Sequence, residues 1–179
     1  MLKYKKQLVA LAITAMLTAV TVVLSRFLSV NLWNMSIGVS FISLMLCGMI
    51  CGPVWGGICA ALADFIGATL FPFGAYFPGF TAVAFLTGII FGIVGICGYK
   101  IKNQAVFIGV AAILLILKEL VCSLIINSFW ISLLYGGPYF AIFVSRVPLS
   151  IITVVFEIVF AIIANMLLLP PIRKVMERM

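Results

Sequence analysis

Histidine is absent from this chain of 179 residues, and only 8% of the residues carry a charge. The absence of histidine excludes Cys/His zinc sites and acid–base catalysis by imidazole. A soluble domain carries about 25% charged residues, so the low charge together with 66% hydrophobic residues excludes an ordinary soluble fold. The length suits one domain and no polar stretch is long enough for a second. We therefore expect residues 1–179 to form a single integral membrane domain.

Cysteine is present but offers no recognisable metal or disulfide pattern. All five cysteines lie in or at the ends of apolar segments: Cys47, Cys51, Cys59, Cys97 and Cys122. We interpret them as small buried residues of a reduced intramembrane core, and we expect neither a metal nor a cofactor.

Positive charge is concentrated in three short clusters that flank the apolar segments. Eight of the eleven basic residues belong to them: Lys3, Lys5 and Lys6; Lys100 and Lys102; Arg173, Lys174 and Arg178. An excess of Lys and Arg beside membrane spans marks the cytoplasmic side. We therefore expect a multi-pass protein of the cell membrane with both termini in the cytoplasm. Nucleic-acid binding is not expected, because that needs basic residues on one exposed face.

The apolar segments predict an all-α bundle of six transmembrane helices. Turn signals such as Gly52-Pro53 and Gly136-Gly137-Pro138 separate them. The expected helices cover approximately residues 6–28, 38–51, 53–71, 80–99, 104–132 and 138–169. The second is short, because about fourteen residues at 1.5 Å each reach only about 21 Å of a core about 30 Å thick. We also expect the first apolar run, residues 8–24, to be a retained span, because it is longer than a signal-peptide core.

Six charged residues remain inside or at the ends of the apolar segments, three of each sign. They are Arg26, Lys118 and Arg146 against Asp64, Glu119 and Glu157. Charges within a membrane are costly and usually mark a ligand, ion or proton site. Arg146 and Glu157 belong to a polar stripe on the last helix, and Asp64 lies in a small-residue stripe that permits close helix approach.

By estimated depth, Asp64, Arg26 and Arg146 lie in the outer half of the bundle, beneath aromatic loops. The aromatic residues around this mouth are Trp33, Tyr76, Phe77, Trp130, Tyr135 and Tyr139. They form either an interfacial aromatic belt above buried ion pairs or the walls of a pocket. A pocket with flat walls and both charge signs suits a planar, polar, partly anionic small molecule.

The first helix carries Ala15 and Ala19, a small-residue pair that serves either internal packing or docking of a membrane partner. Arg26 is eleven residues from Ala15, so a straight helix points both in the same direction. The helix is therefore expected to curve or unwind near Ser25, unless one of these roles is wrong.

Two segments carry a resemblance to a known family. They are LSRFLSVNLWNMSIGVSFISLMLCGMICGPVWGGICAALADFIGATLFPFGAYFPGF (24–80) and NSFWISLLYGGPYF (127–140). Both resemble the folate family of energy-coupling factor (ECF) transporter S components. The most specific part is ADFIGATLFPFGAYFPGF (63–80), and Ser43 departs from the proline expected in the second helix.

The resemblance implies a vitamin-capturing subunit that binds its substrate on the extracellular side and is not an enzyme. Such subunits work with a transmembrane coupling protein and two cytoplasmic ATPases. Ala15 and Ala19 match the motif that meets the coupling protein. The lack of a phosphate-binding Gly-Lys-Ser/Thr loop agrees with ATP hydrolysis in separate subunits.

If the ligand is folate, a carboxylate is expected to accept the 2-amino and ring N–H groups of the pterin. We assign this role to Asp64, with Trp33, Tyr76 and Phe77 covering the ring. Arg26 and Arg146 are expected to bind oxygen atoms of the pterin or of the glutamate tail. The remaining site residues are Lys118, Trp130 and Tyr139, although internal pairing is the first expectation for Lys118 with Glu119 and Glu157.

Three alternatives stay open. The first is an S component for another vitamin, such as pantothenate, a thiamin precursor or a queuosine precursor. The second is a membrane assembly protein without a ligand. An intramembrane enzyme is the least favoured, because without histidine it needs a Ser–Lys or carboxylate mechanism and no serine pairs convincingly with Lys118.

Overall fold

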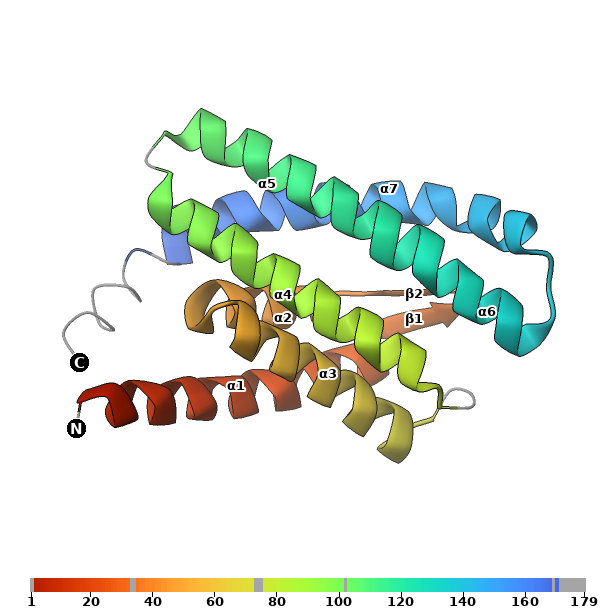
Figure 1. Cartoon of the computed structure of the whole chain (residues 1–179), viewed down its shortest axis with the longest axis horizontal. Helices are drawn as coiled ribbons and strands as arrows, with labels where there is room; N and C mark the ends of the chain where they lie inside the picture. Colours follow the sequence, from red (N-terminus) through yellow and green to blue (C-terminus); the bar gives the residue numbers. More distant parts are fainter. Residues whose placement is uncertain (1, 33–34, 73–75, 102, 169, 171–179) are drawn as a thin grey trace.

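The structure is a computed structural model that describes residues 2–32, 35–72, 76–101, 103–168 and 170. Helices form almost all of it, with one short hairpin (Figure 1). The elements are α1 (Leu2–Phe27), β1 (Ser29–Leu32), β2 (Met35–Gly38), α2 (Ser40–Cys51), α3 (Pro53–Leu70), α4 (Pro78–Lys100), α5 (Gln104–Lys118), the π-helix η1 (Glu119–Ile126), α6 (Asn127–Tyr135), α7 (Tyr139–Ile163) and the π-helix η2 (Ala164–Leu168).

Six helical segments cross the molecule, as the sequence predicts. One runs without interruption through α5, η1 and α6, and another through α7 and η2. Within the described residues, five segments are long and apolar enough to cross a membrane, and α2 is the shorter exception. Its 12 residues span about 18 Å at 1.5 Å each. The chain therefore has the all-α fold of a membrane protein.

The connection between α1 and α2 is a β-hairpin, where the sequence analysis predicts only a polar loop. Its register pairs Ser29 with Gly38 and Leu32 with Met35. The cause is local, because polar and apolar residues alternate in Ser29–Leu32, which is the period of a strand. The hairpin lies alongside α7 and continues the layer that the short α2 leaves incomplete (Figure 1).

The helix ends gather at two opposite ends of the bundle. Their arrangement agrees with an even number of membrane crossings between one basic cluster and the next. The start of α1, the α2–α3 turn, the α4–α5 connection and the end of η2 lie at one end of the bundle (Figure 1). The hairpin and the α3–α4 and α6–α7 connections lie toward the opposite end, which we call the outer end. Lys100 is exposed at the first of these ends.

Close backbone contacts hold α2, α3 and α4 together. A Cβ atom added at Gly56 would lie 2.6 Å from the carbonyl oxygen of Gly88, and one added at Gly48 would lie 2.7 Å from the backbone nitrogen of Gly92. Small residues permit such approach between membrane helices. These glycines of α4 therefore serve internal packing between helices.

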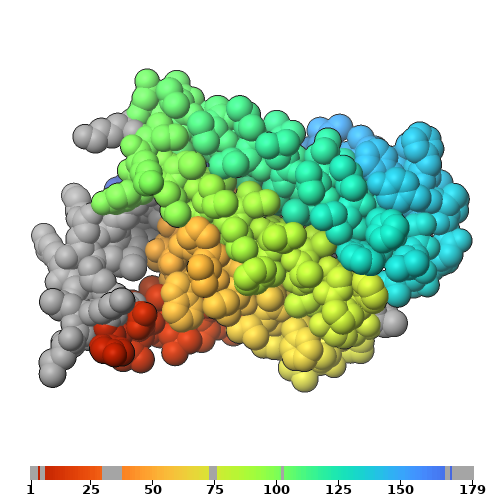
Figure 2. Space-filling model, viewed as in Figure 1, coloured from red at the N-terminus to blue at the C-terminus, as the bar shows by residue number. Residues whose placement is uncertain are grey.

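Apolar side chains form both the core and much of the surface. The core cluster includes Phe91, Phe107 and Leu115, which are almost completely buried. Large apolar residues such as Ile113 and Phe156 are exposed, as lipid contact requires. Figure 2 shows α4, α5 and α6 covering one face of the bundle without a wide opening.

Candidate functional site

A cluster near the outer end joins α3, the start of α4 and the end of the connection between them. Thr81 Oγ1 lies 2.7 Å from Asp64 Oδ2 and 3.2 Å from the Tyr76 hydroxyl. We call Asp64, Thr81 and Tyr76 the outer cluster. Asp64 is half-buried and faces α4, which agrees with its place in a stripe of small residues that permits close helix approach. The sequence analysis missed Thr81, because a threonine near the start of an apolar helix carries no signal of its own.

Arg26 extends from α1 across α3 toward this cluster. A Cβ atom added at Gly67 would lie 2.6 Å from Arg26 Nε, so the guanidinium passes close to the backbone of α3 at this crossing. The positive charge of Arg26 is attracted by Asp64. The structure thus brings together two predicted site residues that are 38 positions apart in the sequence.

Of the curving or unwinding expected near Ser25, the unwinding does not occur. Helix α1 continues to Phe27, and both Arg26 and Ala15 lie on the side that faces α3. The two roles are compatible because they occupy different depths. Ala15 lines a groove along the inner part of the α1–α3 contact. Arg26 crosses α3 at Gly67, beyond the outer end of that groove.

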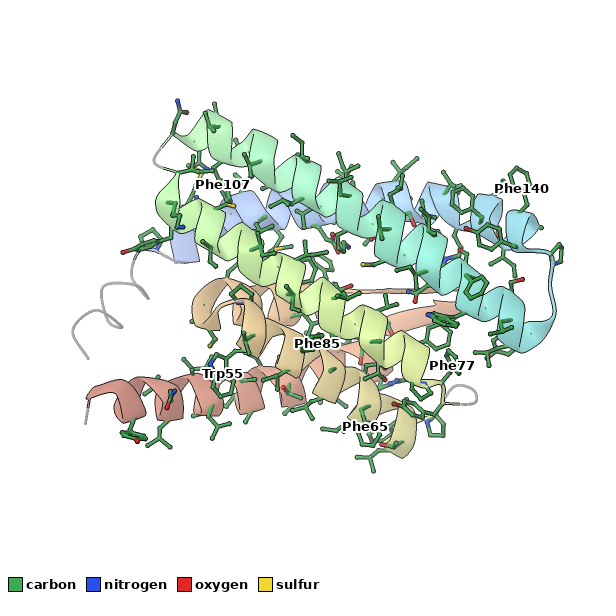
Figure 3. All side chains as sticks on the ribbon, viewed as in Figure 1. Trp55, Phe65, Phe77, Phe85, Phe107 and Phe140 are labelled. Atoms are coloured by element: carbon green, nitrogen blue, oxygen red, sulfur yellow. The ribbon has the colours of Figure 1, made fainter. Side chains whose placement is uncertain are left out.

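Two predicted aromatic residues pack against each other beside the start of α4. The rings of Phe77 and Trp130 are 5.0 Å apart between centroids, and the indole Nε1 of Trp130 is buried without a partner among the described residues. Figure 3 shows Phe77 where α4 begins. Tyr76 packs edge-on against Phe65 at 5.6 Å. These side chains cover the outer part of the α3–α4–α6 region.

Another predicted aromatic residue, Tyr139, has a different packing partner. Tyr139 packs against Phe143 of its own helix, and 38% of its surface is exposed. Trp33 lies outside the residues that the structure describes.

Deeper in the bundle, one lysine binds two carboxylates. Lys118 Nζ is 2.7 Å from Glu119 Oε2 and 2.7 Å from Glu157 Oε1, and all three side chains are buried. The ammonium group also lies 5.5 Å from the centroid of the Phe91 ring. The expected internal pairing of these three residues is confirmed.

The helix type changes at the point where two adjacent charged residues are both buried. Consecutive α-helical residues point about 100° apart, yet Lys118 and Glu119 are both buried. The π-helix η1 begins at Glu119 and widens the turns up to Ile126. Such segments occur frequently at functional sites. The sequence analysis predicts a plain helix here and does not detect this change.

Arg146 of α7 points toward η1 and lines a polar cavity of about 220 Å³. Its Nη2 donates to Ser123 Oγ at 3.4 Å, and only 5% of the residue is exposed. The cavity is lined by Val83, Thr87, Lys118, Glu119, Cys122, Ser123, Asn127, Arg146 and Thr153. We call it the ionic pocket. It combines charged and neutral hydrogen-bonding groups in a water-poor interior, where such bonds are strong.

An apolar groove lies between α1 and α3, with a volume of about 480 Å³. Ala15 and Ala19 line it and are both exposed. The rest of the lining is mostly apolar: Leu11, Thr14, Thr18, Val22, Val23, Trp55, Ile58, Leu62 and Ile66. The alanines therefore belong to an open surface, which favours the docking alternative over internal packing.

Comparison with known proteins agrees with this architecture. The sequence model of the family described as "ECF-type riboflavin transporter, S component" matches residues 5–170. Two curated relatives are named folate transporter FolT. The protein from Clostridium novyi (strain NT) is 34% identical over 132 residues, covering 74% of this chain and 73% of its own length. The protein from Leuconostoc mesenteroides subsp. mesenteroides is 33% identical over 121 residues, covering 68% of this chain and 62% of its own.

Solved structures have the same fold. A crystal structure of FolT bound with folic acid has a TM-score of 0.76 and 34% identity, covering 87% of this chain and 93% of that one. The S component for biotin from an ECF-type ABC transporter has a TM-score of 0.64 over 97% of this chain and 93% of that one. At 14% identity, this second likeness shows the fold alone.

Proposed function

This chain belongs to the S components of ECF-type vitamin transporters, and from that premise we propose that it is the folate-binding subunit of such a transporter. It captures folate on the extracellular side and delivers it inward with an energy-coupling module. The whole chain, residues 1–179, acts as one membrane domain in this proposal. The subunit binds and carries the vitamin and does not transform it.

One observation carries the choice of folate. The relative solved with folic acid matches this chain over 87% of its length at 34% identity. Both curated relatives at 33–34% identity are also named folate transporters. The family description names riboflavin, so riboflavin is the second candidate ligand.

The outer cluster suits the pterin end of folate. The pterin edge presents two adjacent donors, the 2-amino group and the ring N–H, followed by a carbonyl acceptor. Asp64 supplies a carboxylate for the two donors, and the nearby Arg26 supplies a cationic donor for the carbonyl. Tyr76 and Phe77 lie beside this position and provide apolar cover for a flat ring. Trp33, which lies between β1 and β2 in the sequence, is assigned to the same cover.

The other end of the ligand carries carboxylates, which arginine binds well. We assign Arg146 to this role, because its guanidinium lines the ionic pocket. Lys118 contributes more weakly, since two of its three N–H donors are already used by Glu119 and Glu157. The unpaired indole N–H of Trp130 is a further donor for the ligand, and Tyr139 lies at the rim.

The groove between α1 and α3 is the proposed contact with the transmembrane coupling subunit. Ala15 and Ala19 leave room for an apolar helix of that partner to approach the backbone of α1. Two cytoplasmic ATPase subunits supply the energy, since the chain has no phosphate-binding loop.

The same proposal places the protein in the cell membrane with both termini in the cytoplasm. The basic ends of the chain favour this orientation. The outer cluster then faces the extracellular side, where the vitamin arrives.

A ligand titration tests the proposal. The detergent-purified protein is titrated with folate, riboflavin and pantothenate while its tryptophan fluorescence is followed. We expect saturable quenching by folate alone, because Trp130 lies beside the proposed site, and we expect Asp64→Ala to abolish it. Thr69→Val is the matched control, since the Thr69 hydroxyl is exposed and bonds only to carbonyls of its own helix. Saturation by riboflavin instead of folate would reassign the substrate.

A further inference from the structure

Between residues 8 and 24, helix α1 carries three polar side chains, and all of them are threonines. Thr14, Thr18 and Thr21 are spaced by four and three residues, which places them on one face of the helix. All three are buried, with at most 6% of their surface exposed. We call them the threonine stripe.

Two members of the threonine stripe contact cysteine thiols of the neighbouring helices. Cys47 Sγ of α2 donates to Thr14 Oγ1 at 3.7 Å, and Thr18 Oγ1 donates to Cys59 Sγ of α3 at 3.3 Å. Thr18 shares its proton with the carbonyl oxygen of Thr14, at 2.8 Å. The hydroxyls of α1 are therefore satisfied within their own helix as well, and the thiols add a preferred direction in which they point.

The third contact is the shortest of the three. Thr21 Oγ1 and Ser43 Oγ of α2 are 2.7 Å apart, and either hydroxyl can be the donor. Both residues are buried, with 2% of their surface exposed. Neither is among the described residues that line the groove between α1 and α3. This pair therefore joins α1 to α2 without forming part of the groove surface.

Contacts of this kind affect how α1 is rotated about its own axis. Lipid tails are as apolar as leucine, so the apolar side chains of α1 do not distinguish the protein from the lipid, whereas hydrogen bonds and close packing do. Turning α1 by one residue position, about 100°, would place Ala15 and Ala19 where the threonine stripe lies and remove them from the groove. Arg26 also faces α3, but beyond the outer end of the groove.

We propose that the threonine stripe positions the docking surface: its contacts with α2 and α3 fix the rotation of α1, so that Ala15 and Ala19 face the coupling subunit. Thr21 and Ser43 act as positioning residues and do not touch that partner. The inference rests on the proposed contact between the groove and the coupling subunit, and it adds the residues that hold this surface in place.

Thr21→Val is the direct test, because valine keeps the branched shape, removes the hydroxyl and leaves the groove lining unchanged. Two quantities are measured in detergent: the Kd for the coupling module, which is the coupling subunit with its two ATPases, and the Kd for folate. We expect the module Kd to rise about threefold, the average effect of one hydrogen bond between membrane helices, while the folate Kd stays the same. Thr21→Ser keeps the hydroxyl and should restore the module Kd.

Ser43→Ala removes the same bond from the side of α2. Its effect on the module Kd should equal that of Thr21→Val, and the double variant should be no weaker than either single one, as expected for two partners in one contact. Thr69→Val is the matched control, because the Thr69 hydroxyl is exposed and bonds to carbonyls of its own helix.

A cross-link separates positioning from general damage. Thr18→Cys places a thiol opposite Cys59, and copper(II) phenanthroline oxidises the two thiols to a disulfide that fixes α1 against α3. In the double variant Thr18→Cys/Thr21→Val, we expect oxidation to restore the module affinity that the reduced protein lacks, since the disulfide sets the same rotation. Damage to packing would not be repaired in this way. Peptide mass spectrometry identifies the cross-link, and the oxidised wild-type protein controls for the native cysteines.

Three outcomes would overturn the inference while Ala19→Leu still impairs docking. They are an unchanged module Kd in both Thr21→Val and Ser43→Ala, the absence of a cross-link to Cys59, and a cross-linked protein that binds the module no better than the reduced one. Ser43→Ala and the cross-link remain available if Thr21→Val does not fold. Full docking of Ala19→Leu would instead overturn the proposed contact in the groove.

Discussion

Lys118 and Glu157 are 39 positions apart in the sequence and form a buried ion pair between α5 and α7, with Nζ 2.7 Å from Oε1. Glu119 binds the same ammonium group at 2.7 Å, so one cation stands between two carboxylates. The positive charge of Arg146 interacts favourably with the negative charge of Glu119. Two positive side chains, Lys118 and Arg146, thus stand against two negative ones, Glu119 and Glu157, which is the balance that the sequence analysis noted for the interior as a whole.

Removing the shared cation should destabilise the bundle more than neutralising one of its partners. Lys118→Met leaves two carboxylates facing each other in the interior, whereas Glu157→Gln leaves one intact pair. Breaking a buried pair by removing one partner costs about 3–5 kcal/mol. We expect a lower thermal unfolding temperature for Lys118→Met than for Glu157→Gln, measured in detergent at one pH. Equal stability of the two variants would mean that Glu119 and Glu157 do not depend on Lys118.

The contact between α3 and α4 should not tolerate a methyl group. Gly88→Ala places a Cβ against the backbone of Gly56, and backbone cannot move aside as a side chain can. Overpacking of this kind costs about 1–3 kcal/mol. Gly109→Ala is the matched control on α5, because nothing lies within 4 Å of its added Cβ. Alanine is the better helix former by about 1 kcal/mol, so this control should gain stability while Gly88→Ala loses it. A stable Gly88→Ala variant would contradict the close packing.

Filling the groove between α1 and α3 should separate ligand binding from transport. Ala19→Leu adds bulk to an exposed groove position and leaves the outer cluster untouched. We expect the folate Kd to change less than twofold, while folate uptake by cells and co-purification of the coupling subunit fall strongly. Ala12→Leu is the control, since Ala12 is exposed on the same helix but does not line the groove. Full uptake by Ala19→Leu would mean that the coupling subunit binds elsewhere.

The two arginines should respond differently when the ligand loses its glutamate tail. Pteroate has the pterin and aminobenzoate parts of folate without that tail. If Arg146 binds the tail, Arg146→Gln should weaken folate by tenfold or more, about 1.4 kcal/mol, and affect pteroate little. Arg26→Gln should weaken both ligands, because Arg26 is assigned to the pterin carbonyl. Isothermal titration calorimetry of both variants with both ligands tests these expected affinities. The opposite pattern would mean that folate binds in the reverse orientation.

Much of the architecture could be predicted from the sequence because it depends on local properties. A span is a continuous apolar run, so the six helices and the short α2 follow from composition and from breakers such as Gly52-Pro53. Interior charges are rare and costly, so Arg26, Asp64 and Arg146 stand out without knowledge of the fold. The segments 24–80 and 127–140 carry the family resemblance, which the comparisons confirm.

Other features depend on which helices are neighbours, and only the tertiary structure decided them. The bond between Thr81 and Asp64 exists because α4 packs against α3, and nothing in the residues around Thr81 signals it. The ion pair between Lys118 and Glu157 exists because α5 packs against α7, which brings together two residues from distant segments. The sequence thus determined which residues are costly to bury in a membrane. The packing of the helices determined which partners offset that cost, because each partner comes from a different part of the chain.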